Sequence, residues 1–124
     1  MIETDAFRDR RILIVEDDFL IADAICEVLD LAGAEIIGPV GRLPEAMSLI
    51  GTVDGLDAVL LDLDLHGEMT YPVADLLRER RIPFVFTTGY SSAVVDDRYR
   101  HHPRCEKPIS ISTMLSTLGA SLAR

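Results

Sequence analysis

The chain has 124 residues, a length typical of one domain, and its 48% hydrophobic content excludes an intrinsically disordered segment. Its net charge of −9 argues against a nucleic-acid-binding surface, so we expect no direct contact with nucleic acid. The apolar runs are too short to cross a bilayer and the N-terminal residues lack the apolar core of an export signal, so we expect a cytoplasmic protein with no membrane partner.

The first half of the chain predicts two strand–helix pairs: a strand over 11–16 (RILIVE), a helix over 19–32, a strand over 34–40 and a helix over 44–50. Asp18 is suited to cap the first helix, whose apolar residues share one face, and Gly33 ends it. Pro44 is typical of a helix start, and Gly51 stands just past the expected end of the second helix.

The second half predicts a strand over 57–62, a helix over 72–80, a strand over 83–88, a short or irregular helix within 90–100, a weak strand over 103–107 and a final helix over 111–122. Ser110 is suited to cap the final helix, which carries an apolar stripe. Strands that alternate with helices through short connections predict a parallel sheet covered by helices on both faces. The sequence therefore predicts one α/β domain.

Polar residues follow several of the predicted strands: Glu16, Asp17, Asp18, Asp62, Asp64, Thr87, Thr88 and Lys107. The C-terminal ends of parallel strands share one edge, where ligands bind, so these residues are expected to converge. Two carboxylates about 4 Å apart repel by roughly 4 kcal/mol at an effective dielectric constant near 20, so the cluster needs a proton, a cation or a base. Oxygen donors select hard ions such as Mg²⁺, and acids, a hydroxyl and a lysine together suit phosphoryl transfer.

Each of these residues also has a simpler interpretation. Asp62 could end a strand, Asp64 could form a turn, and Thr88 could be an ordinary strand residue. For Asp18 the helix cap is the better interpretation. The segment 98–104 (RYRHHPR) is interpreted as a solvated basic face that could dock a partner.

The stretches ILIVEDD, VLLDLDLHG, IPFVFTTGY and EKP, in this order, resemble the receiver domain of two-component response regulators over nearly the whole chain. The resemblance implies a flavodoxin-like (βα)5 three-layer sandwich with parallel strand order 2-1-3-4-5. It implies a single receiver domain over 1–124, with its core at about 10–123, that stands alone. Such a domain is a phosphoprotein in a phosphorelay, a switch rather than an enzyme.

The resemblance also assigns a role to each matching residue of the metal site. Asp62 matches the phosphoacceptor. Glu16 and Asp17 match the acidic pair that holds Mg²⁺ or Mn²⁺, Asp17 directly and Glu16 through water. Asp62 is a further metal ligand, and Asp64 matches the position whose backbone carbonyl binds the metal.

Two further residues match the switch itself. Thr88 matches the hydroxyl that reaches the phosphoryl group, whereas Thr87 stands one residue too early. Lys107 matches the lysine that pairs with the phosphate, and its bond to Pro108 is expected to be cis.

One position departs from the usual receiver pattern. Receivers commonly carry Tyr or Phe three residues before the lysine, a ring that swings inward on activation, but this chain has Arg104. The stretch FTTGY, Phe86 to Tyr90, instead resembles a subgroup with a Phe-Ala-Thr-Gly motif that is often paired with HWE-type histidine kinases. We therefore hypothesise a different relay, through the segment 90–100 or through Tyr90 itself.

The resemblance implies protein partners. A histidine kinase, with the HWE type as one candidate, or a phosphotransfer protein would donate the phosphoryl group, and a downstream protein would read the switch. A homodimer is an open alternative.

Two other functions stay open from the sequence. The stretch DLD after an apolar strand also resembles the nucleophile motif of haloacid-dehalogenase-like phosphatases, although their acidic pair follows the lysine. A phosphorylation-independent binding module is the third hypothesis. Steady release of phosphate would favour the phosphatase, and partner binding unchanged by Asp62→Asn would favour the binding module.

Overall fold

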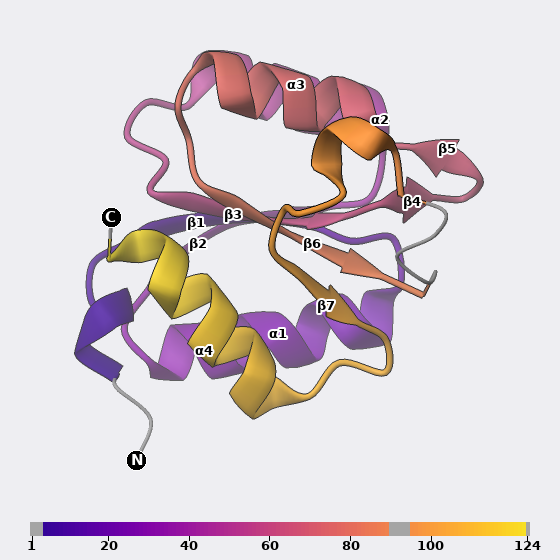
Figure 1. Ribbon diagram of the computed structural model, residues 1–124. Helices are drawn as coiled ribbons and strands as arrows, with labels where there is room; N and C mark the ends of the chain where they lie inside the picture. Colours follow the sequence, from indigo (N-terminus) through magenta and orange to yellow (C-terminus); the bar gives the residue numbers. More distant parts are fainter. Residues whose placement is uncertain (1–3, 90–94, 124) are drawn as a thin grey trace.

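The computed structural model describes residues 4–89 and 95–123 (Figure 1). Its elements, in chain order, are η1 (Thr4–Phe7), β1 (Arg11–Val15), α1 (Phe19–Leu31), β2 (Glu35–Val40), α2 (Leu43–Thr52), β3 (Ala58–Asp62), β4 (Asp64–Leu65), β5 (Glu68–Met69), α3 (Tyr71–Glu79), β6 (Phe84–Thr88), η3 (Asp97–Tyr99), β7 (Arg104–Glu106) and α4 (Ile111–Leu122). Within the described residues, no helix combines the length and apolar character needed to cross a bilayer.

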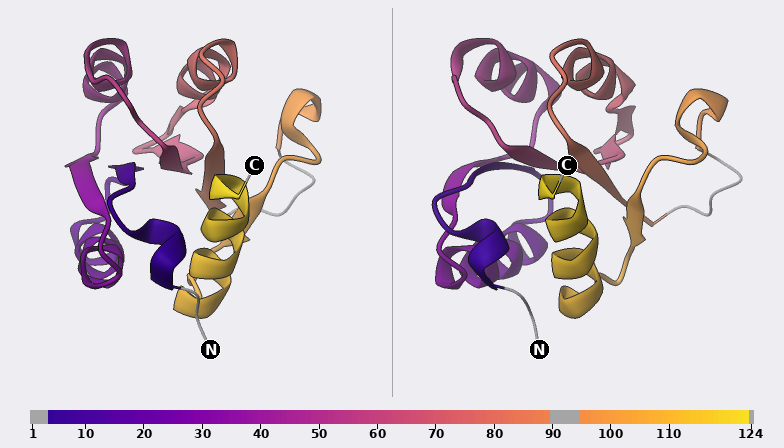
Figure 2. Two further views of the ribbon diagram at one scale, coloured as in Figure 1. Left: turned by 90° about the vertical axis from the view of Figure 1, so that its left-hand side faces the viewer. Right: turned by 60° about the vertical axis from the view of Figure 1, so that its left-hand side comes forward.

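The main sheet is parallel, with strand order β2-β1-β3-β6-β7. Numbered as the predicted strands, this order is 2-1-3-4-5, so the predicted flavodoxin-like fold is confirmed. Helices α2 and α3 cover one face, and α1 and α4 cover the other (Figures 1 and 2). The sheet is therefore the middle layer of three, and its polar edge is the one where every strand ends.

Alternate residues of the central strands supply two separate cores. Leu13, Leu61 and Phe86 face α2 and α3, together with Tyr99 from η3. The residues between them in each strand face α1, α4 and η1; these are Ile12, Ile14, Ala58, Leu60 and Val85. Strands buried on both faces explain why the sequence shows continuous apolar runs rather than alternation.

Several local features differ from the sequence-based predictions. The second helix continues through Gly51 to Thr52, so its predicted end before Gly51 is wrong; this glycine has open space around it. A short hairpin, β4–β5, follows β3 and was not predicted. The predicted irregular helix is represented by η3, whereas Tyr90 lies outside the described residues.

Candidate functional site

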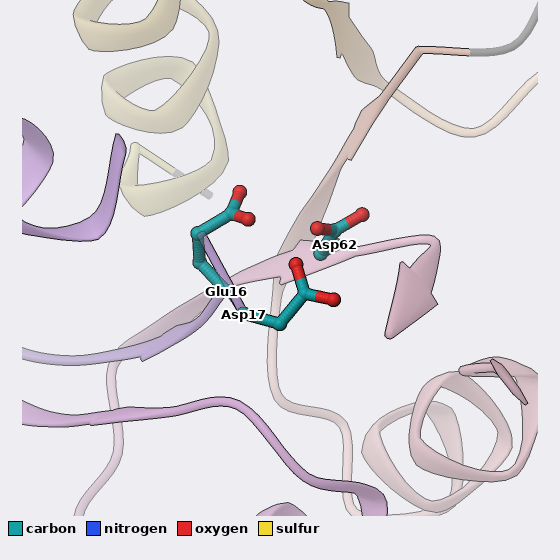
Figure 3. A group of neighbouring side chains, drawn as sticks. All are labelled: Glu16, Asp17 and Asp62. Carbon is teal, nitrogen blue, oxygen red and sulfur yellow. The ribbon is translucent and has the colours of Figure 1, made fainter. Parts of the chain in front are cut away.

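Three carboxylates gather at the C-terminal edge of the sheet. Glu16 and Asp17 directly follow β1, and Asp62 is the last residue of β3, the neighbouring strand. One oxygen from each side chain lies within 4.8 Å of the others (Figure 3). Glu16 and Asp62 are buried, and Asp17 is partly exposed, so the cluster opens to solvent on the Asp17 side.

Lys107 places a positive charge against two of these acids. Its Nζ lies 2.9 Å from Oδ2 of Asp62 and 3.0 Å from Oε1 of Glu16. The backbone N–H of Lys107 donates to the carbonyl of Thr88 at 2.8 Å, which fixes the lysine beside the end of β6. The Lys107–Pro108 bond is cis, as predicted.

The charges of this cluster perturb one another. Burial, followed by the nearby Asp62 carboxylate, raises the pKa of Glu16 from 4.5 to about 7, although a backbone hydrogen bond from Asp18 opposes the shift. Burial alone would lower the pKa of Lys107, but its hydrogen bonds to Asp62 and Glu16 outweigh burial and raise it. Lys107 therefore stays charged, while Glu16 is poised to bind or release a proton near neutral pH.

A buried threonine, which the sequence analysis did not single out, positions the end of β3. The hydroxyl of Thr70 donates to the carbonyl of Asp62 at 2.6 Å, and this side chain is fully buried. The backbone N–H of Asp64 donates to Oδ1 of Asp62 at 3.1 Å. The first bond holds the backbone at Asp62 and the second holds its carboxylate. The only sequence signal for Thr70 was its place just before the Pro-containing start of α3.

The β4–β5 hairpin positions Asp17. Its two turn residues, His66 and Gly67, have φ values of 51° and 89°, as a tight hairpin turn requires. The backbone N–H of His66 donates to Oδ2 of Asp17 at 2.8 Å, and the N–H of Gly67 donates to Oδ1 of Asp64 at 2.7 Å. The sequence analysis gave His66 no role, because this contact joins residues far apart in the chain.

The remaining polar residues of this edge have distinct places. Oδ1 of Asp18 accepts from the backbone N–H groups of Leu20 and Ile21, so Asp18 is the helix cap that its simpler interpretation predicted. Thr88 ends β6 and is buried. Asp62 pairs in register with Thr87, so Thr88 lies one residue beyond the end of β3.

The donor set is compatible with a hard divalent cation such as Mg²⁺. All three clustered side chains offer carboxylate oxygens, which are the ligands such ions prefer. Oε1 of Glu16 is buried and accepts no hydrogen bond from the described residues, although it is in ion-pair contact with Lys107. A buried carboxylate oxygen of this kind has capacity left for a cation or for water held by one.

No protein-family model matches the chain, but individual relatives are found both by sequence and by structure. The structure of SdrG from Sphingomonas melonis Fr1 has a TM-score of 0.80 and 38% identity, covering 96% of this chain and 98% of SdrG. A second SdrG structure, in its BeF3-activated conformation, has a TM-score of 0.76 and 38% identity over 90% of this chain and 95% of that one.

Two further relatives extend the comparison. The REC domain of the response regulator PhyR from Erythrobacter litoralis shares the fold, with a TM-score of 0.81 at 24% identity over 94% of this chain and 92% of that chain. The transcriptional regulatory protein PdtaR of Mycobacterium tuberculosis is 30% identical over 126 residues. The match covers 98% of this chain but 61% of PdtaR. The chain belongs to the response regulator receiver domains.

In this receiver domain of two-component signalling, Arg104 stands where receivers commonly carry Tyr or Phe, and its side chain contacts the end of η3 instead. The guanidinium of Arg104 donates to the carbonyl of Arg100 at 3.0 Å and to that of Tyr99 at 3.5 Å, so it holds the end of η3. The ring of Tyr99 is buried and lies edge-on to Phe86, with centroids 5.5 Å apart. This receiver therefore fills the inner face beside β6 with a ring from η3.

Tyr99 is also tied to α3. Its hydroxyl donates to Oδ1 of Asp75 at 2.5 Å, and Arg98 donates to the same carboxylate at 2.9 Å. The hydrogen bond from Tyr99, and then those from Arg98, lower the pKa of Asp75. Tyr71, at the start of α3, stacks on Tyr99 with centroids 5.9 Å apart. These contacts join η3 to α3 as one unit.

Proposed function

We propose that this receiver accepts a phosphoryl group on Asp62 from the phosphohistidine of a histidine kinase, for which the HWE type is one candidate, or of a phosphotransfer protein. The observation that carries the proposal is the position of Asp62. Its carboxylate ends the central strand β3, and Oδ2 lies 2.9 Å from Nζ of Lys107. Glu16 and Asp17 supply two further carboxylates beside it.

In the proposed reaction, a carboxylate oxygen of Asp62 attacks phosphorus and the P–N bond to the donor imidazole breaks. The electron pair of that bond stays on the imidazole nitrogen, which then takes up a proton from solvent. Asp62 acquires about −1.5 to −2 charges in place of −1. Lys107 already contacts this carboxylate, so its ammonium group lies close enough to pair with the added charge.

A bound Mg²⁺ or Mn²⁺ would supply charge neutralisation and would orient the phosphoryl oxygens. Asp17 and Asp62 would hold it directly, Glu16 through water, and Asp64 through its backbone carbonyl. The hairpin contact from His66 to Asp17 fixes the carboxylate that faces solvent, where a cation would enter. These residue roles follow from the resemblance and from the donor chemistry of the cluster.

The switch would run from Thr88 to η3. Because successive strand residues point to opposite faces, Thr88 lies on the same face of the sheet as Phe84 and Phe86. Phe86 contacts Tyr99, which is tied to Asp75 on α3. A movement of the Thr88 hydroxyl toward a phosphoryl group would therefore be transmitted to η3, changing the surface that a downstream protein reads.

Phosphorylation itself is the test. The wild-type receiver, Asp62→Asn and Asp64→Asn would be incubated with acetyl phosphate and Mg²⁺ and analysed by intact-mass spectrometry. We expect one phosphoryl adduct on the wild type and on Asp64→Asn, which keeps its backbone carbonyl, and none on Asp62→Asn. An adduct on Asp62→Asn, or none on the wild type with either acetyl phosphate or phosphoramidate, would refute the assignment.

Turnover separates a switch from a phosphatase. With a small phosphomonoester and Mg²⁺, we expect no steady release of inorganic phosphate beyond one equivalent per chain. Continuous release that disappears in Asp62→Asn would instead support the haloacid-dehalogenase-like alternative. Amide NMR spectra recorded with beryllofluoride would show whether the shifts reach η3 and α3.

A further inference from the structure

We infer that a basic face at the opposite end of β6 from Asp62 binds an acidic segment of a partner protein that carries an apolar anchor residue. The basic face consists of the side chains that line two adjoining cavities between the end of α3 and the loop before β7. Its cationic and titratable members are Arg78, Arg81, Arg98, Tyr99, His101 and His102, together with one carboxylate, Asp97. The proposal concerns the unphosphorylated receiver and does not require phosphorylation of Asp62.

Positive charge is concentrated at this face of an acidic molecule. The chain has a net charge of −9, yet three arginines line these two cavities against a single lining carboxylate, Asp97. Among the described residues, neither Arg78 nor Arg81 forms an ion pair, whereas Arg98 is paired with Asp75 and Asp96. The charge of Arg78 still acts on Asp75, whose pKa it helps to lower. The guanidinium of Arg78 lies over the ring of Tyr99, 5.3 Å from its centroid.

The larger of the two cavities has an apolar wall and a charged rim. It has a volume of about 420 Å³, and its apolar wall is formed by Ile82, Pro83 and Phe84. His102 builds one side: its ring stacks on Phe84 with centroids 4.0 Å apart, and its Nε2 lies 2.7 Å from the carbonyl of Phe84. A rigid apolar pocket with arginines at its rim matches an apolar side chain flanked by carboxylates.

The larger cavity lies at the start of β6, far along the strand from the acidic cluster. Phe84 is the first residue of β6, whereas Thr88, next to the acidic cluster, is the last. In Figure 1, the end of α3 lies on the same side of the sheet as the orange turn η3, and the hydrogen bonds from η3 to Asp75 confirm that they are neighbours. The basic face therefore lies at the opposite end of β6 from the acidic cluster.

A protein segment fits this surface better than nucleic acid does. A nucleic acid needs an extended basic stripe, and the remainder of this acidic molecule would repel its phosphates. The planar guanidinium groups of Arg78 and Arg81 can each bind a carboxylate through two hydrogen bonds. An acidic peptide with one apolar residue uses both the rim and the pocket.

The test is a titration of the full receiver with a short synthetic peptide rich in glutamate that contains one phenylalanine. The comparison peptides replace the phenylalanine with serine, or every glutamate with glutamine, and a short single-stranded DNA represents nucleic acid. Binding is followed by amide NMR and calorimetry at low and high salt. We expect shifts at 78–84 and 98–103, weaker binding at high salt, and clear loss of affinity for both comparison peptides.

Matched variants separate a site from general attraction. Arg78→Gln with Arg81→Gln is expected to weaken binding by about tenfold. Arg8→Gln with Arg42→Gln removes the same charge from other exposed positions and should leave binding nearly unchanged. Thermal unfolding of both double variants checks that they fold. Arg81→Gln alone, at an exposed position, is the milder second variant.

Three outcomes would overturn the inference. They are an equal loss of affinity in the two double variants, tighter binding of DNA than of the peptide, and shifts that avoid the basic face. Titration of unphosphorylated receiver and of receiver with beryllofluoride should give the same site. A failure of phosphorylation at Asp62 would therefore leave this test intact.

Discussion

Lys107 reaches from the end of β7 to place its ammonium nitrogen 2.9 Å from Oδ2 of Asp62, at the end of β3. The same nitrogen lies 3.0 Å from Glu16, so one cation serves two buried carboxylates. This shared cation makes the stability of the site depend on pH and on added metal.

Replacing this lysine should destabilise the receiver most where both acids are ionised. Lys107→Met leaves Glu16 and Asp62 without a cation, and we expect the free energy of unfolding at about pH 8 to fall by about 3 kcal/mol. At about pH 6 the loss should be smaller, because a proton on Glu16 relieves the repulsion. Urea denaturation at the two pH values measures this, with Lys107→Arg as the charge-preserving control. An equal loss at both would contradict the explanation.

The raised pKa of Glu16 predicts a pH dependence of the metal-free receiver. The native state keeps a proton on Glu16 up to about pH 7, whereas the unfolded chain loses it near 4.5. Between these values the native state binds more protons, so the free energy of unfolding should fall as pH rises, by an amount on the order of 3 kcal/mol. The stabilisation from the protonated Glu16 is complete below its unfolded pKa of 4.5, and it is lost as pH rises through its folded pKa of about 7.

Glu16→Gln is the control for this dependence, because a neutral amide cannot titrate. Its stability should change much less than that of the wild type across the same pH range in chelator-treated buffer. A slope of the same size in the variant would assign the pH dependence to other groups.

Added Mg²⁺ should stabilise the folded receiver and raise its melting temperature. At a metal concentration of about 100 times Kd, binding to the native state alone contributes about 2.7 kcal/mol. We expect the effect to disappear in Asp17→Asn and to persist in Asp18→Asn, since asparagine still caps α1. Differential scanning fluorimetry measures both, and an undiminished shift in Asp17→Asn would exclude Asp17 as a ligand.

The hydrogen bond from Tyr99 to Asp75 should contribute to the attachment of η3. Tyr99→Phe removes the hydroxyl and keeps the ring, so we expect a loss of about 1 kcal/mol of stability. Tyr99→Phe and Asp75→Asn should be non-additive in a double-mutant cycle. The pKa of Asp75 is lower in the folded protein than its unfolded value of 3.8. The stabilisation that the ionised Asp75 contributes is therefore present above pH 3.8 and is lost as pH falls through the folded pKa. Additive losses would show that the two groups act independently.

The fold and the location of the acidic cluster could be predicted from the sequence because both follow from local patterns. Apolar runs fixed the strands, and a parallel sheet brings their C-terminal ends to one edge, so Glu16, Asp17, Asp62 and Lys107 had to converge. The same reasoning placed Thr88 beside them. Their chemical roles stay predictions.

The contacts that support this cluster could not be predicted, because they join residues through the fold rather than through spacing. Thr70 binds a backbone carbonyl, and His66 reaches Asp17 only because two turn residues adopt positive φ. Tyr99 stood in a polar stretch of weak periodicity, where nothing marked it as a core residue. The charge pattern was equally hidden, because the stretch RYRHHPR gave no sign that Arg98 pairs with Asp75 on α3.

Strand β3 is buried along its whole length and hydrogen-bonded on both sides, to β1 and to β6. Its amide protons should therefore be among the slowest in the molecule to exchange with deuterium, opening only when the entire domain unfolds. A chemical event at the tip of such a rigid strand cannot be absorbed by bending it. Because β3 stays in place, we expect a displacement that starts at Asp62 to appear in the less tightly packed elements at the margin of the sheet.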